Sequence, residues 1–114
     1  MSELLEKVKV VVTVPTDNTN DLRIAMSEAG AGAIGNYTCC STVTKSIGTF
    51  IPNENANPYI GKNDILEFVE EDKLEMVCSK NKVAKVVKAI RSIHPYEEPA
   101  IDIIPLLNEK QFKL

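Results

Sequence analysis

The chain has 114 residues, of which 44% are hydrophobic and 25% charged, and a formal net charge of −3. A chain of this length has room for one domain with a modest core. Its dispersed and slightly acidic charge argues against a nucleic-acid partner, and no apolar run is long enough to cross a membrane. We therefore expect a single soluble domain over residues 1–114.

The start of the chain and its cysteines indicate a compartment. Residues 1–6 are acidic and lack the basic segment of a secretion signal. The three cysteines are an odd number, and two of them are adjacent, so they do not form a disulfide framework. Both observations favour the cytoplasm.

The first third of the chain predicts a strand followed by a helix. Residues 8–14 are apolar and β-branched, as in a strand buried on both faces, and Pro15 ends them. The helix is expected to end at Gly30, because glycine tolerates the left-handed conformation there. Its N-cap oxygens would come from Asp17, Asn18 or Thr19, and its buried stripe comprises Leu22, Ala25, Met26 and Ala29.

The middle of the chain predicts two strands around a loop. Residues 37–51 are rich in Thr, Ser, Cys, Val and Ile and indicate a long strand, with Gly48 as a β-bulge. Residues 52–61 are rich in Pro, Asn and Gly and form a loop, either functional or a simple connector. Residues 65–78 alternate in part, which predicts one or two strand pieces with a kink or bulge near residues 70–72.

The last third predicts a second helix and a final strand. Apolar residues fall at helical spacing up to His94, with lysines and an arginine on the opposite side; they are Val83, Val86, Val87, Ile90 and Ile93. Residues 100–104 are apolar and form the last strand. The tail from Asn108 would fray or add a short edge strand.

The order strand, helix, strand, strand, helix, strand predicts an α+β, ferredoxin-like sandwich, with two helices on one face of an antiparallel sheet. Val11 and Ile104 are apolar at positions of opposite parity to Val10 and Ile103. A second apolar sheet face would be buried against another subunit, so we expect self-association.

A polar joint connects the second helix to the last strand. It runs His94-Pro95-Tyr96-Glu97-Glu98-Pro99 and holds the only histidine. The two prolines fix their own φ and restrict the residues before them, so this connector is stiff.

Five motifs, in this order, closely resemble the YqfO-type proteins, also called the NGG-one-interacting factor three family. They are residues 30–37 (GAGAIGNY), 40–41 (CS), 48–52 (GTFIP), 56–61 (ANPYIG) and 94–100 (HPYEEPA). The resemblance covers residues 30–106 and implies a CutA-like or PII-like domain that is inserted in longer members. The run at 94–97 is also similar to the C-terminal motif of the trimeric CutA divalent-cation-tolerance proteins.

The resemblance also bears on activity. Longer members carry the ligands of two metal ions on flanking lobes, and this sequence contains one histidine. The dinuclear metal site is therefore not carried over to this chain, and neither is the hydrolase or GTP cyclohydrolase label of the family. We expect no enzyme activity.

His94, Glu97 and Glu98 are the candidate metal ligands, since imidazole and carboxylates suit a divalent transition metal. A neighbouring subunit would have to complete such a site. In the alternative, His94 caps the last helical turn, Tyr96 packs at an interface and the glutamates pair with lysine or arginine.

Other residues are candidates through the resemblance alone. Gly35, Asn36 and Tyr37, with Asn57 and Pro58, would line a ligand pocket at a subunit junction, as in PII-like trimers. The candidate ligand-binding residues also include those of the polar joint: His94, Tyr96, Glu97 and Glu98. The glycines at 30, 32 and 35 follow a helix and lack the lysine of a phosphate loop, so a helix stop and turn is the simpler interpretation.

The cysteines offer little chemistry. Adjacent residues of a strand face opposite sides, so Cys39 and Cys40 would not share a metal, and Cys78 lies in another predicted strand. We expect inert thiols.

The leading hypothesis is a homotrimeric module that binds a small-molecule ligand or a protein partner and catalyses nothing. The alternative is a CutA-like protein that binds a divalent metal ion, the one candidate cofactor. A metal-dependent hydrolase or cyclohydrolase is the third hypothesis.

Overall fold

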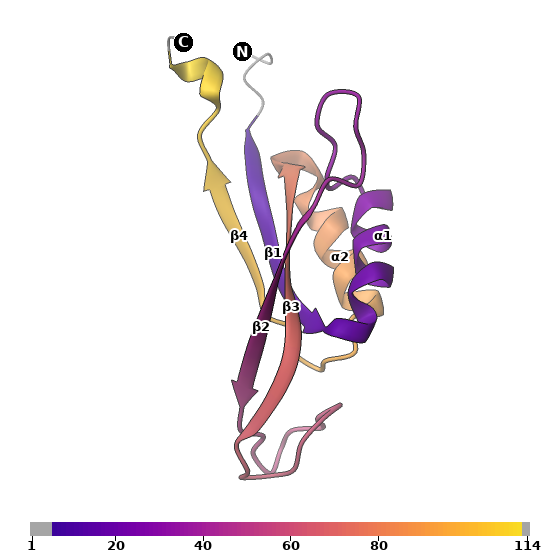
Figure 1. The fold of residues 1–114 in the computed structure, drawn as a ribbon, viewed down its shortest axis with the longest axis vertical. Helices are drawn as coiled ribbons and strands as arrows, with labels where there is room; N and C mark the ends of the chain where they lie inside the picture. Colours follow the sequence, from indigo (N-terminus) through magenta and orange to yellow (C-terminus); the bar gives the residue numbers. More distant parts are fainter. Residues whose placement is uncertain (1–5, 113–114) are drawn as a thin grey trace.

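A computed structural model describes residues 6–112 as a four-stranded antiparallel sheet with two helices on one face (Figure 1). The strands lie in the order β2-β3-β1-β4. The elements are β1 (Lys7–Pro15), α1 (Thr19–Glu28), β2 (Thr42–Phe50), β3 (Glu67–Ser79), α2 (Val83–Ile93) and β4 (Ile101–Leu106). The predicted ferredoxin-like α+β fold is confirmed.

The core lies between the sheet and the helices. Every second residue of β1 from Val8 to Val14 faces the helices, as the two-residue period of a strand requires. Each helix contributes two fully buried side chains at a spacing of four residues, which are Leu22 and Met26 from α1 and Val86 and Ile90 from α2. The predicted stripe of the second helix is thus only partly buried, and Ile93 at its end is exposed.

Strand β3, of 13 residues, joins the sheet together because it pairs with β2 on one side and with β1 on the other. It pairs with β2 from Glu67 to Glu75 and with β1 from Glu71 to Ser79, and both registers run without a break. Residues 67–79 are thus one continuous strand, and the bulge predicted near residues 70–72 is wrong. The predicted bulge at Gly48 is also wrong, since Gly48 pairs directly with Val69.

The helix starts differ from the expected caps. A 3₁₀ turn, Thr16–Asn18, precedes α1, and the N-cap Asn18 makes no side-chain capping bond. Thr19 instead donates from Oγ1 to Oδ2 of Asp72 at 2.7 Å, and Nζ of Lys45 lies 2.9 Å from the other carboxylate oxygen. These contacts, that of Thr19 first, hold the pKa of Asp72 below its ordinary value.

Residues 30–41 form a folded-back loop, so β2 begins later than predicted. Gly30 ends α1 with a φ of +117°, as expected. The N–H of Cys40 donates to the carbonyl of Gly32 at 2.9 Å, and Cys39 has a left-handed φ of 58°. Neither cysteine is in a strand. Both are half-buried and free, and Cys78 is free and buried.

The sheet face away from the helices is not the apolar surface that was predicted. Val11 is already buried within the single chain, while Ile104 is 47% exposed near the β4 edge. Thr13, Lys73 and Glu75 are polar residues of the same face. The exposed apolar side chains gather elsewhere.

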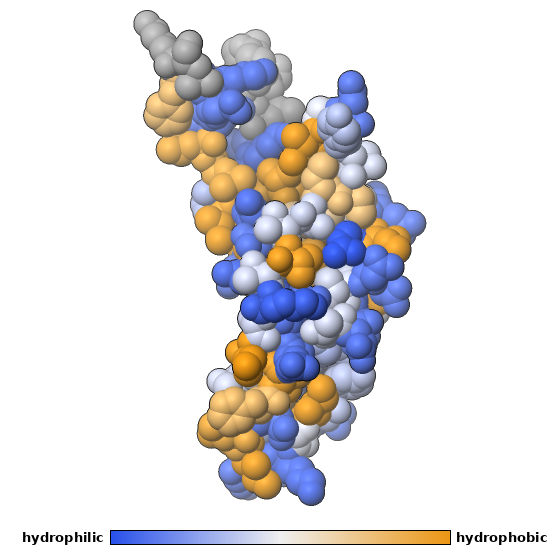
Figure 2. All heavy atoms as spheres, in the orientation of Figure 1, coloured by the Kyte–Doolittle hydropathy of each residue, from blue (hydrophilic) through white to orange (hydrophobic). Residues whose placement is uncertain are grey.

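The far ends of β2 and β3, residues 47–50 and 67–70, continue past both helices and with residues 51–66 form what we call the arm (Figure 1). Apolar side chains gather over this arm and along β4 (Figure 2). The molecule measures 52 × 25 × 24 Å, and its radius of gyration is 16.0 Å. A compact chain of this length would have a radius of about 13 Å, so the arm extends from the body of the domain.

The C-terminal tail neither frays directly after Asn108 nor adds a strand. It forms a 3₁₀ turn, Glu109–Gln111, that Asn108 and Gln111 close with a capping box. Within residues 6–112, no helix has the length and apolar character needed to span a membrane.

Candidate functional site

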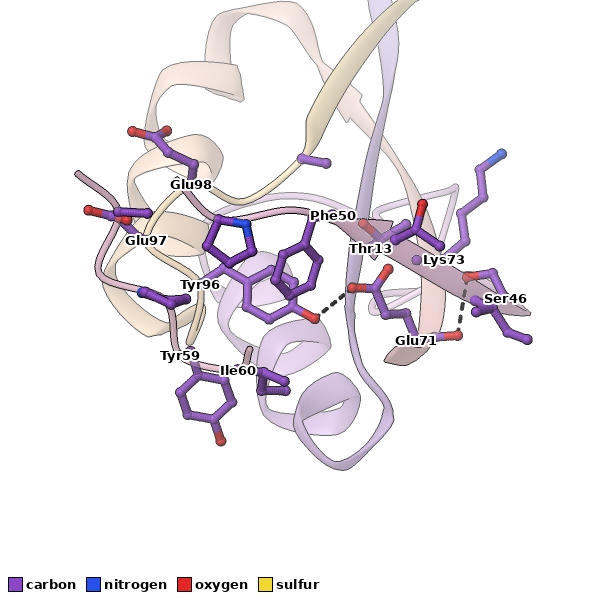
Figure 3. Close-up of a pocket in the computed structure, with 17 residues that line it drawn as sticks. Thr13, Ser46, Phe50, Tyr59, Ile60, Glu71, Lys73, Tyr96, Glu97 and Glu98 are labelled. Atoms are coloured by element: carbon purple, nitrogen blue, oxygen red, sulfur yellow. Dashed lines mark hydrogen bonds between the residues drawn. The ribbon is translucent and has the colours of Figure 1, made fainter. Parts of the chain in front are cut away.

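A cavity of about 580 Å³ opens where the arm meets the connector between α2 and β4 (Figure 3). Its walls come from three strands, from the arm loop and from the connector: Thr13 of β1, residues 46–50 of β2, Glu71 and Lys73 of β3, residues between Pro52 and Ile60, and residues between Tyr96 and Ala100. Cavities of this volume suit small-molecule ligands.

The innermost polar contact of the cavity joins Tyr96 to Glu71. The Tyr96 hydroxyl donates to Oε2 of Glu71 at 2.6 Å, and Glu71 is only 6% exposed (Figure 3). Burial, and then the bond to Glu71, raise the pKa of Tyr96, so its hydroxyl stays protonated. The Ser46 hydroxyl donates to the backbone carbonyl of Glu71 at 3.2 Å, so it is also engaged.

Gly48 leaves room for the Glu71 carboxylate. A Cβ added to Gly48 would overlap Oε1 and Cδ of Glu71. A glycine inside a strand often marks such a close approach. The glycine in β2 thus allows a carboxylate to lie flat between two paired strands.

Two further aromatic rings, of Phe50 and Tyr59, lie near the ring of Tyr96. The ring centroid of Tyr96 lies 6.1 Å from that of Phe50 and 6.4 Å from that of Tyr59. Both pairs are tilted, as aromatic pairs prefer. The rings come from β2, the arm loop and the connector, which are far apart in the sequence.

The rim of the cavity is acidic. The backbone N–H of Asn57 donates to Oε1 of Glu97 at 2.9 Å and ties the arm loop to the connector. Glu98 approaches Arg91 at 3.7 Å, but both side chains are exposed, so this ion pair adds little stability. Glu71, Glu97 and Glu98 together outnumber the one lysine of the lining, Lys73.

His94 positions Tyr96 and lies behind the cavity wall. Its Nδ1 accepts from the backbone N–H of Tyr96 at 3.1 Å, so Nε2 carries the proton and donates to the Thr13 carbonyl at 2.8 Å. Thr13 directly follows Val12, which forms with Ile101 the last residue pair between β1 and β4. Burial lowers the pKa of His94, which is 8% exposed. The imidazole is therefore neutral and structural.

Comparison with known proteins agrees with this geometry. The chain is 52% identical over 101 residues to a protein of Halalkalibacterium halodurans named GTP cyclohydrolase 1 type 2 homolog, and the match covers 89% of this chain and 27% of that protein. The chain is a homologue of one segment of these proteins. It spans about a quarter of their length, and the resemblance to YqfO-type proteins is confirmed. No family model matches the sequence.

Solved structures agree with this relationship. The fold superposes on a Bacillus cereus protein related to NIF3 with a TM-score of 0.80 and 41% identity, covering 91% of this chain and 26% of that one. It also superposes on the periplasmic divalent cation tolerance protein CutA of Archaeoglobus fulgidus with a TM-score of 0.65, over 88% of this chain and 83% of that one. The second match has 17% identity and shows a common fold alone.

Several predicted site residues of this homologous segment come together. Pro58, Tyr96, Glu97 and Glu98 line the cavity, and Asn57 is bonded to Glu97. His94 lies next to Tyr96, with ring centroids 5.1 Å apart, but is not part of the lining.

The other three predicted residues lie elsewhere. Gly35, Asn36 and Tyr37 belong to the loop after α1, at the end of the molecule opposite the arm (Figure 1). An isolated bridge between Ile34 and Tyr37 closes a small turn there. This loop does not contribute to the cavity within a single chain.

The metal ligands proposed from the sequence do not form a cluster. Within residues 6–112, no three His, Cys, Asp or Glu side chains are grouped closely enough to hold a metal ion. Both nitrogens of His94 are already hydrogen-bonded, Glu97 is tied to Asn57 and Glu98 faces Arg91. His94 would have to give up two hydrogen bonds before it could ligate a metal.

Sequence reasoning missed Glu71, Phe50 and Tyr59. Glu71 stands in a run of three acidic residues that was interpreted as a kink or bulge, and its burial follows from the strand register. One signal was present: Gly48 inside a predicted strand indicated a close approach as well as a bulge.

Proposed function

We propose that this segment is a non-catalytic module that binds a small ligand in the cavity between the arm and the connector. The observation that carries the proposal is the hydrogen bond between Asn57 and Glu97, which holds the arm loop beside a cavity lined by aromatic and acidic residues. The relatives are named for a cyclohydrolase, but the chain spans about a quarter of their length, so that activity is not assigned to it.

The chemistry of the cavity supports binding over catalysis. A nucleophile needs a neighbouring base to activate it. Here the Ser46 hydroxyl donates to a backbone carbonyl, the pKa of Tyr96 is raised, and His94 has both nitrogens engaged. None of these groups is poised to remove a proton from a substrate.

A fragment titration tests the proposal. We would titrate isotope-labelled protein with a panel of neutral, anionic and cationic fragments and follow backbone amide signals by NMR. Saturable shifts should concentrate at Gly48, Asn57 and Tyr96. If fragments of every class leave these signals unmoved, the proposed function is wrong.

Two matched variants locate the binding. Tyr59→Ala removes an exposed ring of the cavity wall, and Tyr37→Ala removes a still more exposed ring in the distant loop after α1. Affinity should fall about three- to tenfold in Tyr59→Ala and stay constant in Tyr37→Ala. The reverse pattern would assign the ligand to the loop at Gly35 and Asn36.

We also propose that the chain assembles as a homotrimer in the cytoplasm. Exposed apolar side chains on the arm and β4 support self-association. The three described cysteines are free, which suits a reducing compartment. Native mass spectrometry of the purified protein would give the number of subunits and any retained small molecule.

Divalent-metal binding is the second candidate function, because the fold matches a protein named for divalent cation tolerance. It requires His94, Glu97 and Glu98 to rearrange. The test is titration with Cu²⁺ and Zn²⁺: stoichiometric binding that is lost in His94→Ala would support this candidate, and binding that persists in that variant would exclude it.

A further inference from the structure

The cavity holds a buried carboxylate that has no cation. Glu71 is 6% exposed, and no lysine, arginine or histidine nitrogen within residues 6–112 lies within 4.0 Å of its oxygens. Oε2 accepts from Tyr96, whereas no described residue donates a hydrogen bond to Oε1. Buried charges in proteins are normally paired, because an isolated one is costly to remove from water.

Asp72, the next residue of the same strand, is a buried carboxylate that does have a cation beside it. Asp72 is as deeply buried on the opposite face of β3, and it receives both the Thr19 hydroxyl at 2.7 Å and the Lys45 ammonium at 2.9 Å. Glu71 accepts a hydrogen bond from the Tyr96 hydroxyl, but no described ammonium group lies beside it. Lys73 lines the same cavity, but Figure 3 shows its amine directed away from Glu71.

The Tyr96 hydroxyl occupies one oxygen of the Glu71 carboxylate, Oε2, at 2.6 Å, and the other oxygen, Oε1, has no described donor. His94 contributes no positive charge, because its Nδ1 accepts a hydrogen bond and only Nε2 carries a proton. The negative charge at the inner wall is therefore not balanced by the described residues.

Aromatic rings line the same cavity as this carboxylate. Phe50 and Tyr59 lie on either side of Tyr96, with ring centroids 6.1 and 6.4 Å from its own. The faces of such rings carry negative potential and attract organic cations at about 6 Å. The remaining wall near them is apolar, with Pro52, Ala56 and Ile60. Within residues 6–112 no three His, Cys, Asp or Glu side chains are grouped closely enough to hold a metal ion, and an anion would meet three carboxylates.

We propose that the cavity binds a small organic cation, an alkylammonium or methylated ammonium group, with its charge beside Oε1 of Glu71 and its carbon atoms against Phe50, Tyr59 and Tyr96. This rests on the proposed ligand-binding function and names the chemical class of the ligand. The cavity volume of about 580 Å³ leaves room for a substituent larger than the ammonium itself.

A pair of probes of equal shape tests the charge requirement. Choline and its uncharged carbon analogue 3,3-dimethylbutan-1-ol would each be titrated into the labelled protein, with the amide signals of Gly48 and Tyr96 as the readout. Choline should bind at least about tenfold more tightly than the analogue, because only the cation can pair with the Glu71 carboxylate.

Variants assign the effect to Glu71. Glu71→Gln keeps the shape of the side chain and removes its charge, so the preference for choline should fall at least about tenfold. Glu75→Gln removes a charge from the same strand and the same face outside the cavity lining, and it should leave the preference unchanged. If Glu71→Gln does not fold, Tyr59→Ala replaces it, since that exposed ring can be removed without uncovering a buried group.

The outcomes separate the two proposals. Equal binding of the two probes, or tighter binding of anionic fragments in the same cavity, would overturn the organic cation and leave the ligand-binding function in place. If no fragment of any class binds, both the ligand-binding function and the organic cation are wrong. Glu71 could instead pair with a lysine or arginine of another copy of the chain. In that case Glu71→Gln would lose assembly and the wild type would show no preference for choline, which would also overturn the proposal.

Discussion

At the scale of the residue, His94 links three parts of the domain through its two ring nitrogens. It ends α2, accepts from the backbone of Tyr96 and donates to Thr13 at the point where β4 no longer pairs with β1. Protonating the ring would place a donor against the Tyr96 N–H. Folding therefore keeps the imidazole neutral.

This predicts a pH dependence of stability. Because the pKa of His94 is lowered below 6.5 by folding, the unfolded chain binds the proton more tightly, and stability is lost as pH falls below about 6.5. The free energy of unfolding should decrease from pH 7.5 to 5 with a contribution of at most about 1.4 kcal/mol per pH unit, the value for one proton. Urea unfolding at several pH values measures it.

The control is His94→Gln, which keeps a hydrogen-bond donor and cannot titrate. Its dependence on pH should be shallower than that of the wild type, and the variant should lose about 1–3 kcal/mol at pH 7.5 because the Tyr96 N–H loses its partner. Asp72 does not confound the comparison, since its lowered pKa places its own loss of stability below pH 3.8. Identical slopes in both proteins would show that His94 titrates normally.

At the scale of the element, the loop after α1 depends on close contact between two backbones. Gly32 has a φ of +81°, and a Cβ there would lie 2.8 Å from the carbonyl oxygen of Cys40 and 2.7 Å from Cε of Met76. The first of these neighbours is backbone and cannot move aside. The loop can cover the end of the core only if this position is glycine.

Two alanine substitutions separate conformation from contact. Gly35 also has a positive φ, of +56°, but a Cβ added there would have no neighbour within 4 Å. Gly35→Ala should cost about 1–2 kcal/mol for the left-handed conformation alone. Gly32→Ala should cost about 1–3 kcal/mol more, because of overpacking. Urea unfolding of both variants measures the difference, and equal losses would contradict the close contact.

At the scale of the whole molecule, the arm leaves apolar side chains without a partner in the single chain. Phe68 is 65% exposed, and Ile47 is similarly exposed on the neighbouring strand. By strand register both lie on the helix side of the sheet. They belong to the arm, which continues past both helices (Figure 1). Exposed apolar surface on this scale is typical of protein interfaces.

The substitution Phe68→Asp should therefore weaken self-association. Burying one phenylalanine contributes about 1.5–3 kcal/mol, so the dissociation constant of the assembly should rise about tenfold or more. Asn63→Asp adds the same charge at an exposed polar position of the arm and should have little effect. Sedimentation over a concentration series measures both. A monomeric wild type would contradict the proposed trimer.

The sequence alone determined the order of the elements, because the spacing of apolar residues that marks a strand or a helix is a local property of the chain. The β-branched run of β1, the apolar stripe of α2 and the glycine after α1 each predict their structure without knowledge of distant residues. These signals sufficed for the ferredoxin-like fold. They failed at residues 70–72, where three acidic residues suggested a kink or bulge and the strand is continuous.

The tertiary structure alone decided the site. Tyr96 meets Glu71 across 25 positions and Asn57 meets Glu97 across 40, and no local pattern encodes either pair. Strand register places Glu71 toward the cavity and Asp72 toward the helices. In the folded chain Lys45 then forms an ion pair with Asp72, while Glu71 has no such partner among the described residues. Burial and pairing of charge are properties of the folded chain, because they depend on which distant residues become neighbours.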